Sequence, residues 1–370
     1  MLLLEIKRQV FLPLLQTVAN IVEKRANQPI LANILIEYKN SNLSVTSMDQ
    51  DIQITASCLD KSFQAIDFAL TVSAKKLVDI FRVLPETETI FLENLDHQLL
   101  IRTKKSRFHL QTLPANDYPL VILPVEQANH IRIEQKILKQ YIAKVQFAMA
   151  QQDFRYYLNG MLFNVLSNQI ELVATDGHRL SWANLPELEN PVPGEWIVPR
   201  KTILELFKLL KDENEQFVDI AIYSKQICFE LNDIQIISKL IDGKFPDYNK
   251  VIPKNHTNVM QVERLEFLQS LQRVAILSTE KFRGIRFILS QNELKIISNN
   301  NEQEEAQELL SVQYQGIPLD IGFNVTYLLE FLSAIDTNHV LCHFNDANSS
   351  MLITLPERDD FKYVVMSMRI

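Results

Sequence analysis

The sequence predicts an α+β fold with antiparallel sheets, built from three copies of one structural unit. Two observations lead to this prediction: the same β-hairpin pattern occurs three times along the 370 residues, and a matched amphipathic helix follows each hairpin. At roughly 150 residues per domain, a chain of this length holds two or three domains. The internal repeat selects three.

The three hairpins alternate apolar and polar residues on both sides of a polar turn, as half-buried antiparallel strands do. They span residues 34–49, 161–176 and 285–300. Val45, Leu172 and Ile296 occupy the same place in the pattern, at spacings of 127 and 124 residues. Unrelated amphipathic segments would not keep this register along the chain.

The helix after each hairpin repeats an apolar and acidic pattern, at residues 77–81, 203–207 and 328–332, with spacings of 126 and 125. Each unit therefore reads helix, strands, helix, strands. The first helices are expected at about 7–22, 134–149 and 262–278, and the second helices at about 74–84, 200–211 and 324–335. Proline-bearing stretches at 119–124 and 246–253 are the expected linkers. The expected domains are residues 1–124, 125–252 and 253–370.

The composition excludes several classes of function. The 7 glycines form neither Gly-x-Gly nor Gly-x-x-x-x-Gly-Lys, so the dinucleotide fingerprint and the phosphate loop are absent. No apolar run approaches the roughly 18 residues of a membrane helix, and Glu5 interrupts the apolar N-terminus, so no secretory signal is expected. The widely spaced Cys58, Cys228 and Cys342 fit a reducing cytoplasm.

The charge is divided unevenly along the chain. The net charge of −8 argues against a nucleic-acid partner when it is read as a bulk property. The six expected helical segments nevertheless carry +8, which leaves −16 for everything else. Basic helices on one face would attract phosphate. The alternative is that the helix lysines are solvated stems that cover apolar surface, and the charge count leaves both interpretations open.

Five segments carry a family resemblance. They are Gln152-Asp-Phe-Arg-Tyr-Tyr-Leu-Asn-Gly-Met-Leu-Phe163, Ala174-Thr-Asp-Gly-His-Arg-Leu180, Lys244-Phe-Pro-Asp-Tyr248, Glu280-Lys-Phe-Arg-Gly284 and Tyr363-Val-Val-Met-Ser-Met-Arg-Ile370. Together with the repeat, they make the whole chain resemble the bacterial DNA polymerase III beta subunit, the sliding clamp family. The resemblance implies three repeated domains of the DNA-clamp fold, each with two helices packed on antiparallel sheets, closing into a ring as a dimer.

The resemblance also implies a function. Such a homodimer encircles double-stranded DNA without reading its sequence, and acts as a non-catalytic processivity factor of replication with no metal and no cofactor. The implied partners are the replicative polymerase alpha subunit, the clamp loader delta subunit and other proteins with a clamp-binding motif. The implied location is the cytoplasm, with no membrane contact.

Three sets of site residues follow from the resemblance. The DNA-binding set is Lys24, Arg25, Gln152, Arg155, Tyr156 and Tyr157. The peptide-binding pocket is Leu158, Thr175, Gly177, His178, Arg179, Leu180, Pro246, Val251, Asn324, Tyr327, Ser350, Val364, Val365, Met366, Met368 and Arg369. The dimer interface is Lys76, Lys105, Arg107, Phe108, Leu110, Ile276, Leu277, Glu302, Glu304, Glu305 and Glu308.

Two positions depart from the family pattern, since many relatives have proline where Ser367 stands and arginine where Lys250 stands. Serine restores a backbone N–H and frees the φ angle. A more mobile C-terminal end and weaker peptide binding are therefore expected.

Two motifs suggest chemistry, and both have a simpler interpretation. His339 and His343, with Cys342, would share a helix face as metal ligands, but this stretch alternates like a strand, where the two histidines lie ~13 Å apart. Asp176 and His178 suggest a hydrolase, yet no nucleophile accompanies them. The remaining rival is an interaction scaffold with the same fold that does not encircle DNA.

Overall fold

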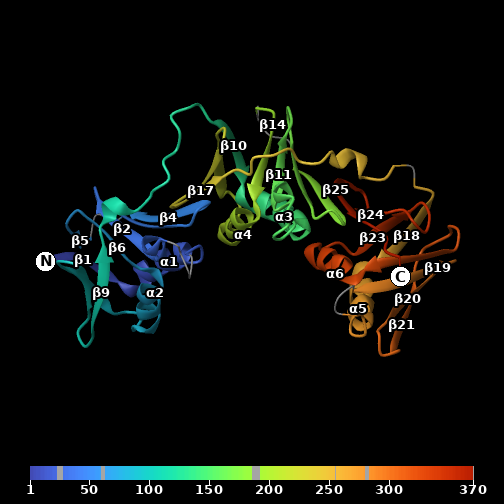
Figure 1. The fold of residues 1–370 in the computed structure, drawn as a ribbon, viewed down its shortest axis with the longest axis horizontal. Coiled ribbons are helices and arrows are strands. Elements are labelled where there is room, and N and C mark those ends of the chain that lie inside the picture. The colour runs from blue at the N-terminus through green and yellow to red at the C-terminus, as the bar shows by residue number, and fades with distance from the viewer. Residues whose placement is uncertain (23–27, 60–62, 186–191, 255, 280–282, 370) are drawn as a thin grey trace. The chain divides into compact units, whose positions relative to one another are not determined.

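The computed structural model describes residues 1–22, 28–59, 63–185, 192–254, 256–279 and 283–369 (Figure 1). The expected DNA-binding residues Lys24 and Arg25 lie outside these ranges. The chain divides into two compact units, each made of two segments. Unit 1 holds residues 1–134 and 213–240, and unit 2 holds residues 135–212 and 241–370.

Six α-helices occur within the described residues, and all six expected helices are confirmed. They are α1 (Arg8–Ala19), α2 (Ala74–Val83), α3 (Gln135–Val145), α4 (Arg200–Leu209), α5 (Arg264–Ala275) and α6 (Val325–Ala334). The largest difference from the expected bounds is at the C-terminal end of α3, where a 3-10 turn, η3 (Gln146–Ala148), replaces the last helical turn. Such turns are common at helix ends.

The three expected hairpins are also confirmed. They are β2 (Asn33–Lys39) with β3 (Asn42–Met48), β11 (Gly160–Val165) with β12 (Ile170–Thr175), and β19 (Gly284–Ser290) with β20 (Glu293–Asn299). Val45, Leu172 and Ile296 occupy the same place in the three repeats, and each pairs with an apolar residue of the neighbouring strand. The pairs are Ile36 with Val45, Phe163 with Leu172, and Phe287 with Ile296.

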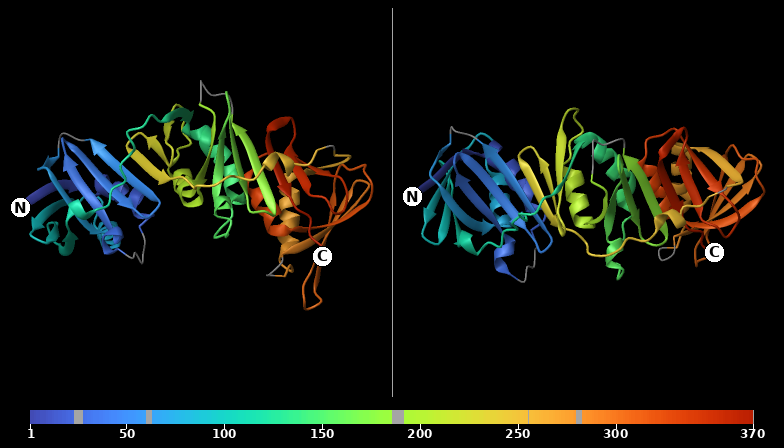
Figure 2. Two further views of the ribbon diagram at one scale, coloured as in Figure 1. Left: turned by 45° about the horizontal axis from the view of Figure 1, so that its top comes forward. Right: turned by 90° about the horizontal axis from the view of Figure 1, so that it is seen from above.

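The strands of unit 1 form one antiparallel sheet in the order β10-β15-β16-β17-β4-β3-β2-β6-β9-β8-β7-β1-β5. The strands not yet bounded are β1 (Leu2–Lys7), β4 (Ile52–Leu59), β5 (Gln64–Ala65), β6 (Phe68–Ser73), β7 (Thr89–Leu95), β8 (Gln98–Arg102), β9 (Arg107–Leu113), β10 (Asn129–Glu134), β15 (Phe217–Ile222), β16 (Gln226–Leu231) and β17 (Ile234–Lys239). Helices α1 and α2 contact each other and the blue strands of Figure 2. The buried rings of Phe11 and Phe81 meet edge to face between the two helices, with centroids 5.1 Å apart.

Unit 2 contains an eight-stranded sheet, β14-β11-β12-β13-β25-β24-β23-β18, and a four-stranded sheet, β21-β20-β19-β22. The remaining strands are β13 (Arg179–Leu185), β14 (Gly194–Pro199), β18 (Asn258–Glu263), β21 (Glu305–Ser311), β22 (Leu319–Asn324), β23 (His339–Phe344), β24 (Met351–Leu355) and β25 (Arg358–Val365). The stretch around His343 is thus a strand, as expected. In the described part of the chain, no cluster of three or more histidines, cysteines and acids could hold a metal ion.

Strand pairs join consecutive repeats. Strand β4 of the first repeat pairs with β17 of the second, and β13 of the second pairs with β25 of the third. The third member of the series, β21, pairs only with β20 among the described strands. Strand β9 occupies the same place in the first repeat as β17 and β25 in the second and third. Over residues 107–111, its partner among the described strands is β8 only. One free strand edge therefore remains at each end of the repeat series.

Candidate peptide-binding and DNA-binding sites

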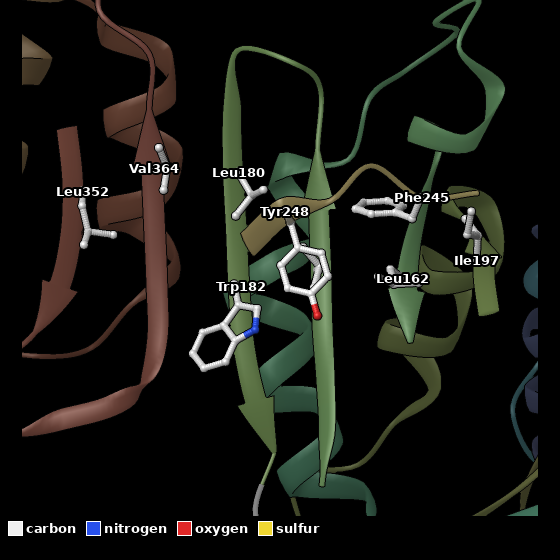
Figure 3. Close-up of a cluster of buried hydrophobic side chains, with 9 residues drawn as sticks. Leu162, Leu180, Trp182, Ile197, Phe245, Tyr248, Leu352 and Val364 are labelled. Atoms are coloured by element: carbon white, nitrogen blue, oxygen red, sulfur yellow. The ribbon is translucent and has the colours of Figure 1, made fainter. Parts of the chain in front are cut away.

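An apolar cluster lies where β13 pairs with β25, and the linker at residues 241–252 packs on it (Figure 3). Leu180 and Val364, both expected in the peptide pocket, are direct cross-strand partners. Phe245 and Tyr248 of the linker belong to the same cluster. The sheet and the linker therefore share one buried apolar cluster, and the expected pocket at this junction stays a prediction.

Two hydrogen bonds hold the linker at Tyr248. Its hydroxyl accepts a bond from Asn164 Nδ2 at 2.7 Å and donates to the Glu171 carboxylate. Burial and the bond to Glu171 raise the pKa of Tyr248 above its usual value. The neighbouring linker residues Pro246 and Val251 are exposed, where a ligand can reach them.

The turn at residues 175–179 has a closed set of hydrogen bonds. Asp176 Oδ1 accepts from the backbone N–H of His178 at 2.9 Å and of Arg179 at 3.1 Å. Thr175 Oγ1 accepts from the N–H of Gly177 at 3.1 Å and donates to the Arg179 carbonyl at 2.6 Å. Gly177 has a φ of +90°, which favours glycine. Because Asp176 bonds to the backbone here, it does not form the pair with His178 that the hydrolase interpretation needs.

Arg179 is the most connected side chain near the turn. Its Nε donates to Asp176 at 3.0 Å, Nη2 donates to the Phe147 carbonyl at 2.6 Å, and Nη1 pairs with Glu330. The guanidinium also lies 4.4 Å from the ring centroid of Tyr327. Arg179 was expected to contact the peptide, but the bonding of all three nitrogens to the chain itself favours a supporting role.

The C-terminal tail is held by three elements. The N–H of Met366 donates to the His178 carbonyl at 2.9 Å, and the N–H of Met368 donates to Gly322 at 2.8 Å. Ser367 Oγ donates to the Asn348 carbonyl at 2.9 Å, a bond that proline could not form. The serine that removes the proline constraint thus adds a tether, which acts against the expected mobility of the tail; that mobility stays a prediction.

The other expected pocket residues differ in accessibility. Leu158 and Val365 are buried; Asn324, Tyr327, Ser350 and Met368 are half-buried; and Arg369 is exposed. Asn324 also caps α6, since its Oδ1 accepts from the N–H of Thr326 at 2.9 Å.

A cavity of about 550 Å³ opens within unit 2. It is lined by Phe147, Met149, Ala150, Gln151, Gln152, Asp153, Phe154, Asp176, His178, Arg179, Arg200, Tyr327 and Glu330. Of these residues, Gln152 was expected to bind DNA, and His178, Arg179 and Tyr327 were expected in the peptide pocket. Arg200, Glu330 and the exposed Phe154 were not expected in any site, and no local pattern in the sequence singles them out. Burial and the charge of Arg179 lower the pKa of Arg200, so its positive charge is held beside a like charge.

The loop at residues 151–159 brings the described part of the expected DNA-binding set together. Gln152 is exposed with a φ of +56°, and Tyr156 is 58% exposed. Tyr157 packs against the apolar cluster. Arg155 is bound within the chain, since Nε and Nη2 lie 3.0 and 2.9 Å from the Asp153 carboxylate. Hydrogen bonds from Arg155 lower the pKa of Asp153 to about 2.

Several helix lysines are paired with acids. Lys139 lies 2.6 Å from Asp212, and Lys208 lies 2.6 Å from Glu205. Lys144 is buried, with Nζ 4.0 Å from Asp360. The +8 counted over the helical segments therefore overstates the positive charge that is open to a ligand.

Most of the expected dimer residues lie at the two free strand edges, and Lys76, Ile276 and Leu277 lie on or after helices. Lys105, Arg107, Phe108 and Leu110 lie on β9 or just before it, and Lys76 is exposed on α2. Glu302, Glu304, Glu305 and Glu308 lie on β21 or just before it, and Arg273 pairs with Glu308. Ile276 and Leu277 follow α5 in a turn, and Ile276 is 77% exposed.

Comparisons with known proteins match this architecture along the whole chain. Residues 2–122, 132–247 and 249–369 match the family models of the N-terminal, central and C-terminal domains of the DNA polymerase III beta subunit. The beta sliding clamps of Pseudomonas putida and Escherichia coli K12 are 42% and 39% identical over 368 and 366 residues, with 99% of each chain covered.

Solved structures agree. The DNA polymerase III subunit beta of Pseudomonas aeruginosa superposes with a TM-score of 0.94 at 42% identity, and all of both chains is covered. The clamp of the same organism bound to griselimycin gives a TM-score of 0.95. Three repeats with two helices each on antiparallel sheets define the DNA-clamp fold. The chain belongs to the DNA polymerase III beta subunit family.

Proposed function

We propose that this protein is the processivity clamp of DNA replication, a ring-shaped homodimer that encircles duplex DNA and has no catalytic activity of its own. The observation that carries the proposal is the pair of free strand edges at the two ends of a threefold repeat. Two junctions of one kind are already formed within the chain, and a third of that kind requires a second copy.

The repeat also supports a register for this third junction. Phe108 of β9 corresponds to Ile236 and Tyr363 of the two formed junctions. Those residues face Ile54 and Ser181. Strand β21 is the equivalent of β4 and β13 in the third repeat, and its Ala306 is the equivalent of Ile54 and Ser181. In the proposed register, Phe108 of one copy therefore faces Ala306 of the other.

Charge supports the same pairing. The β9 edge carries Lys105 and Arg107, while β21 and the residues before it carry four glutamates. In the proposed register Arg107 faces Gln307, with Glu305 two residues away on the same face of the strand. These exposed pairs steer and align the edges, whereas Phe108, Leu110, Ile276 and Leu277 provide most of the affinity.

The groove at the β13·β25 junction is the proposed site for partner peptides. Met366 is 46% exposed and offers an adaptable apolar side chain, whereas Leu180 and Val364 belong to the buried cluster next to the proposed site. The replicative polymerase alpha subunit, the clamp loader delta subunit and other clamp-binding-motif proteins would compete for it. The whole predicted pocket set stays part of this proposal, as do the three domain boundaries and a cytoplasmic location. Within the described residues, every helix is too short or too polar to cross a membrane.

DNA would contact the loop with Gln152 and Tyr156, together with Lys24, Arg25, Arg155 and Tyr157. Amide and hydroxyl groups that contact phosphate or sugar position DNA without reading its sequence. The pairing of Arg155 with Asp153 leaves Gln152 and Tyr156 as the more accessible members of the set.

Retention on circular DNA tests the proposal. Protein loaded by its clamp loader onto a nicked plasmid should stay bound at high salt and should leave when the plasmid is cut. Phe108→Asp places a carboxylate in the apolar contact, so this variant should have the chain mass of 42.9 kDa rather than twice that mass, and should not be retained. Wild-type protein that stays monomeric, or that stays bound to linear DNA with free ends, would contradict encirclement.

A further inference from the structure

The turn at residues 175–179 joins β12 to β13 and contacts the C-terminal tail, next to the proposed peptide site. Its His178 carbonyl accepts the N–H of Met366, which anchors the C-terminal tail to the second repeat. Its shape depends on the Asp176 carboxylate, since Oδ1 accepts two backbone N–H groups. Any group that fixes Asp176 therefore also fixes the point where the tail is attached.

Arg179 fixes Asp176. The Arg179 side chain is 8% exposed, and its Nε lies 3.0 Å from Asp176 Oδ2. A buried guanidinium is stable only when its donors are satisfied. The Phe147 carbonyl accepts a hydrogen bond from Nη2, and the remaining nitrogen, Nη1, forms an ion pair with Glu330.

Glu330 differs from the other partners in its place in the chain. It lies on α6, in the third repeat, whereas Arg179, Asp176 and Phe147 belong to the second. Its side chain is 43% exposed, so its replacement by an isosteric amide opens no cavity. The charge of Glu330 thus joins the helix of one repeat to the turn of the other.

We propose that Glu330 is a positioning residue of the peptide groove: through Arg179 and Asp176 it fixes the 175–179 turn, and with it the carbonyl that anchors Met366. The inference rests on the proposed peptide-binding function. When the carboxylate is removed, Nη1 loses its anionic partner and Arg179 reorients toward water. Asp176 then loses the bond to Nε, and the turn and the tail loosen together.

The test compares Glu330→Gln with Asp320→Asn. Asp320 forms an ion pair with Arg286 at the surface of the same repeat, between β22 and β19, so its variant removes a similar charge pair away from the groove. Calorimetry with a Gln-Leu-Ser-Leu-Phe peptide should show about tenfold weaker binding for Glu330→Gln and wild-type affinity for Asp320→Asn.

Hydrogen exchange separates positioning from general loss of stability. In Glu330→Gln, the amides of His178, Arg179 and Met366 should exchange about tenfold faster, while amides of β19 and β20 keep their wild-type rates. Glu330→Asp keeps the charge and should recover part of the lost affinity. It also serves as the test if Glu330→Gln does not fold.

The experiment distinguishes failure of the proposed peptide-binding function from failure of the positioning role of Glu330. If the wild-type protein does not bind the peptide, the proposed function fails. If the wild type binds it and both Glu330 variants keep full affinity with unchanged exchange at Met366, the positioning role of Glu330 is overturned and the function stands. Faster exchange throughout unit 2 in Glu330→Gln would also overturn it, because the effect would then be global.

Discussion

The two junctions between repeats share one backbone plan and differ in their side chains. Gln53 at the β4·β17 junction corresponds to Leu180 at the β13·β25 junction, and Lys239 corresponds to Met366. The buried Gln53 accepts the N–H of Val121 in the first linker at 2.8 Å.

The first junction is thus closed by polar groups of its own chain, and Lys239 adds an ion pair with Asp51 at 3.8 Å. The second junction presents apolar side chains at the same positions. The comparison teaches that the same strand pairing accommodates polar side chains at one junction and apolar side chains at the other, and the proposed partner site lies at the apolar one.

The largest expected effect concerns the second junction. Tyr363 is fully buried, stacks on Phe331 with centroids 4.8 Å apart, and donates to the Tyr327 carbonyl at 3.0 Å. Tyr363→Ala should lower the free energy of unfolding by about 4 kcal/mol in a urea titration. The exposed Tyr156→Ala should change it by less than about 0.5 kcal/mol. A loss below about 1 kcal/mol for Tyr363→Ala would show that this stack does not hold the junction.

The linker tyrosines sharpen the comparison. The Tyr248 hydroxyl bonds to a carboxylate and an amide side chain, whereas the Tyr118 hydroxyl has backbone partners, the Asn33 carbonyl at 3.3 Å and the backbone of Met48. Tyr248→Phe should cost about 2 kcal/mol and Tyr118→Phe about 0.5 kcal/mol. Equal costs in paired denaturation curves would mean that the two linkers are held alike.

Acid should weaken the packing around His343 on β23 before it weakens the contact between Glu126 and Ser224. Burial, and then the charge of His256, lower the pKa of His343 to about 4. The unfolded chain therefore takes up this proton below about pH 6.5, while the folded chain does not. Full linkage between these two pKa values amounts to about 2.4 kcal/mol from pH 7 to 4.5; because the ring is only half-buried, we expect a loss of about 1.5 kcal/mol, and His343→Gln should lose less. Backbone and hydroxyl bonds from Ser224 lower the pKa of Glu126 below its usual 4.5, so the contribution of this contact is lost only at lower pH. Identical pH profiles for wild type and His343→Gln would contradict this.

The smallest expected effect is at Lys239. Its ion pair is exposed on both sides, so Lys239→Met should change the free energy of unfolding by less than about 0.5 kcal/mol. Peptide binding should stay at one equivalent per chain, because Gln53 still seals the first junction. Two equivalents in calorimetry would break the comparison.

The repeat could be predicted from the sequence because strand and helix periodicities are local. Val45, Leu172 and Ile296 mark hairpins by alternation alone, and all six helices followed from apolar spacing. Element ends were less predictable, as at α3, because capping and 3-10 turns depend on a few weak bonds.

The family pattern predicts which residues form the sites, and that stays a prediction; the bonding of those residues could not be predicted from the sequence. Glu330 lies 151 residues from Arg179, and no local rule connects the two. Asp153 is only two residues from Arg155, but their pairing depends on the conformation of the loop. Ser367 shows the same limit: its freed backbone was predictable, and its bond to Asn348 needs the folded neighbour.

The interleaving of the two units has a consequence for synthesis on the ribosome. Strand β4 ends at Leu59, yet its partner β17 ends at Lys239. At roughly 5–20 residues per second, translation of the intervening chain takes on the order of 10 to 40 seconds. The edge of β4 stays uncovered during this interval, and an unpaired edge is a template for aggregation. A nascent chain that stalls before residue 240 would therefore need a chaperone at this edge.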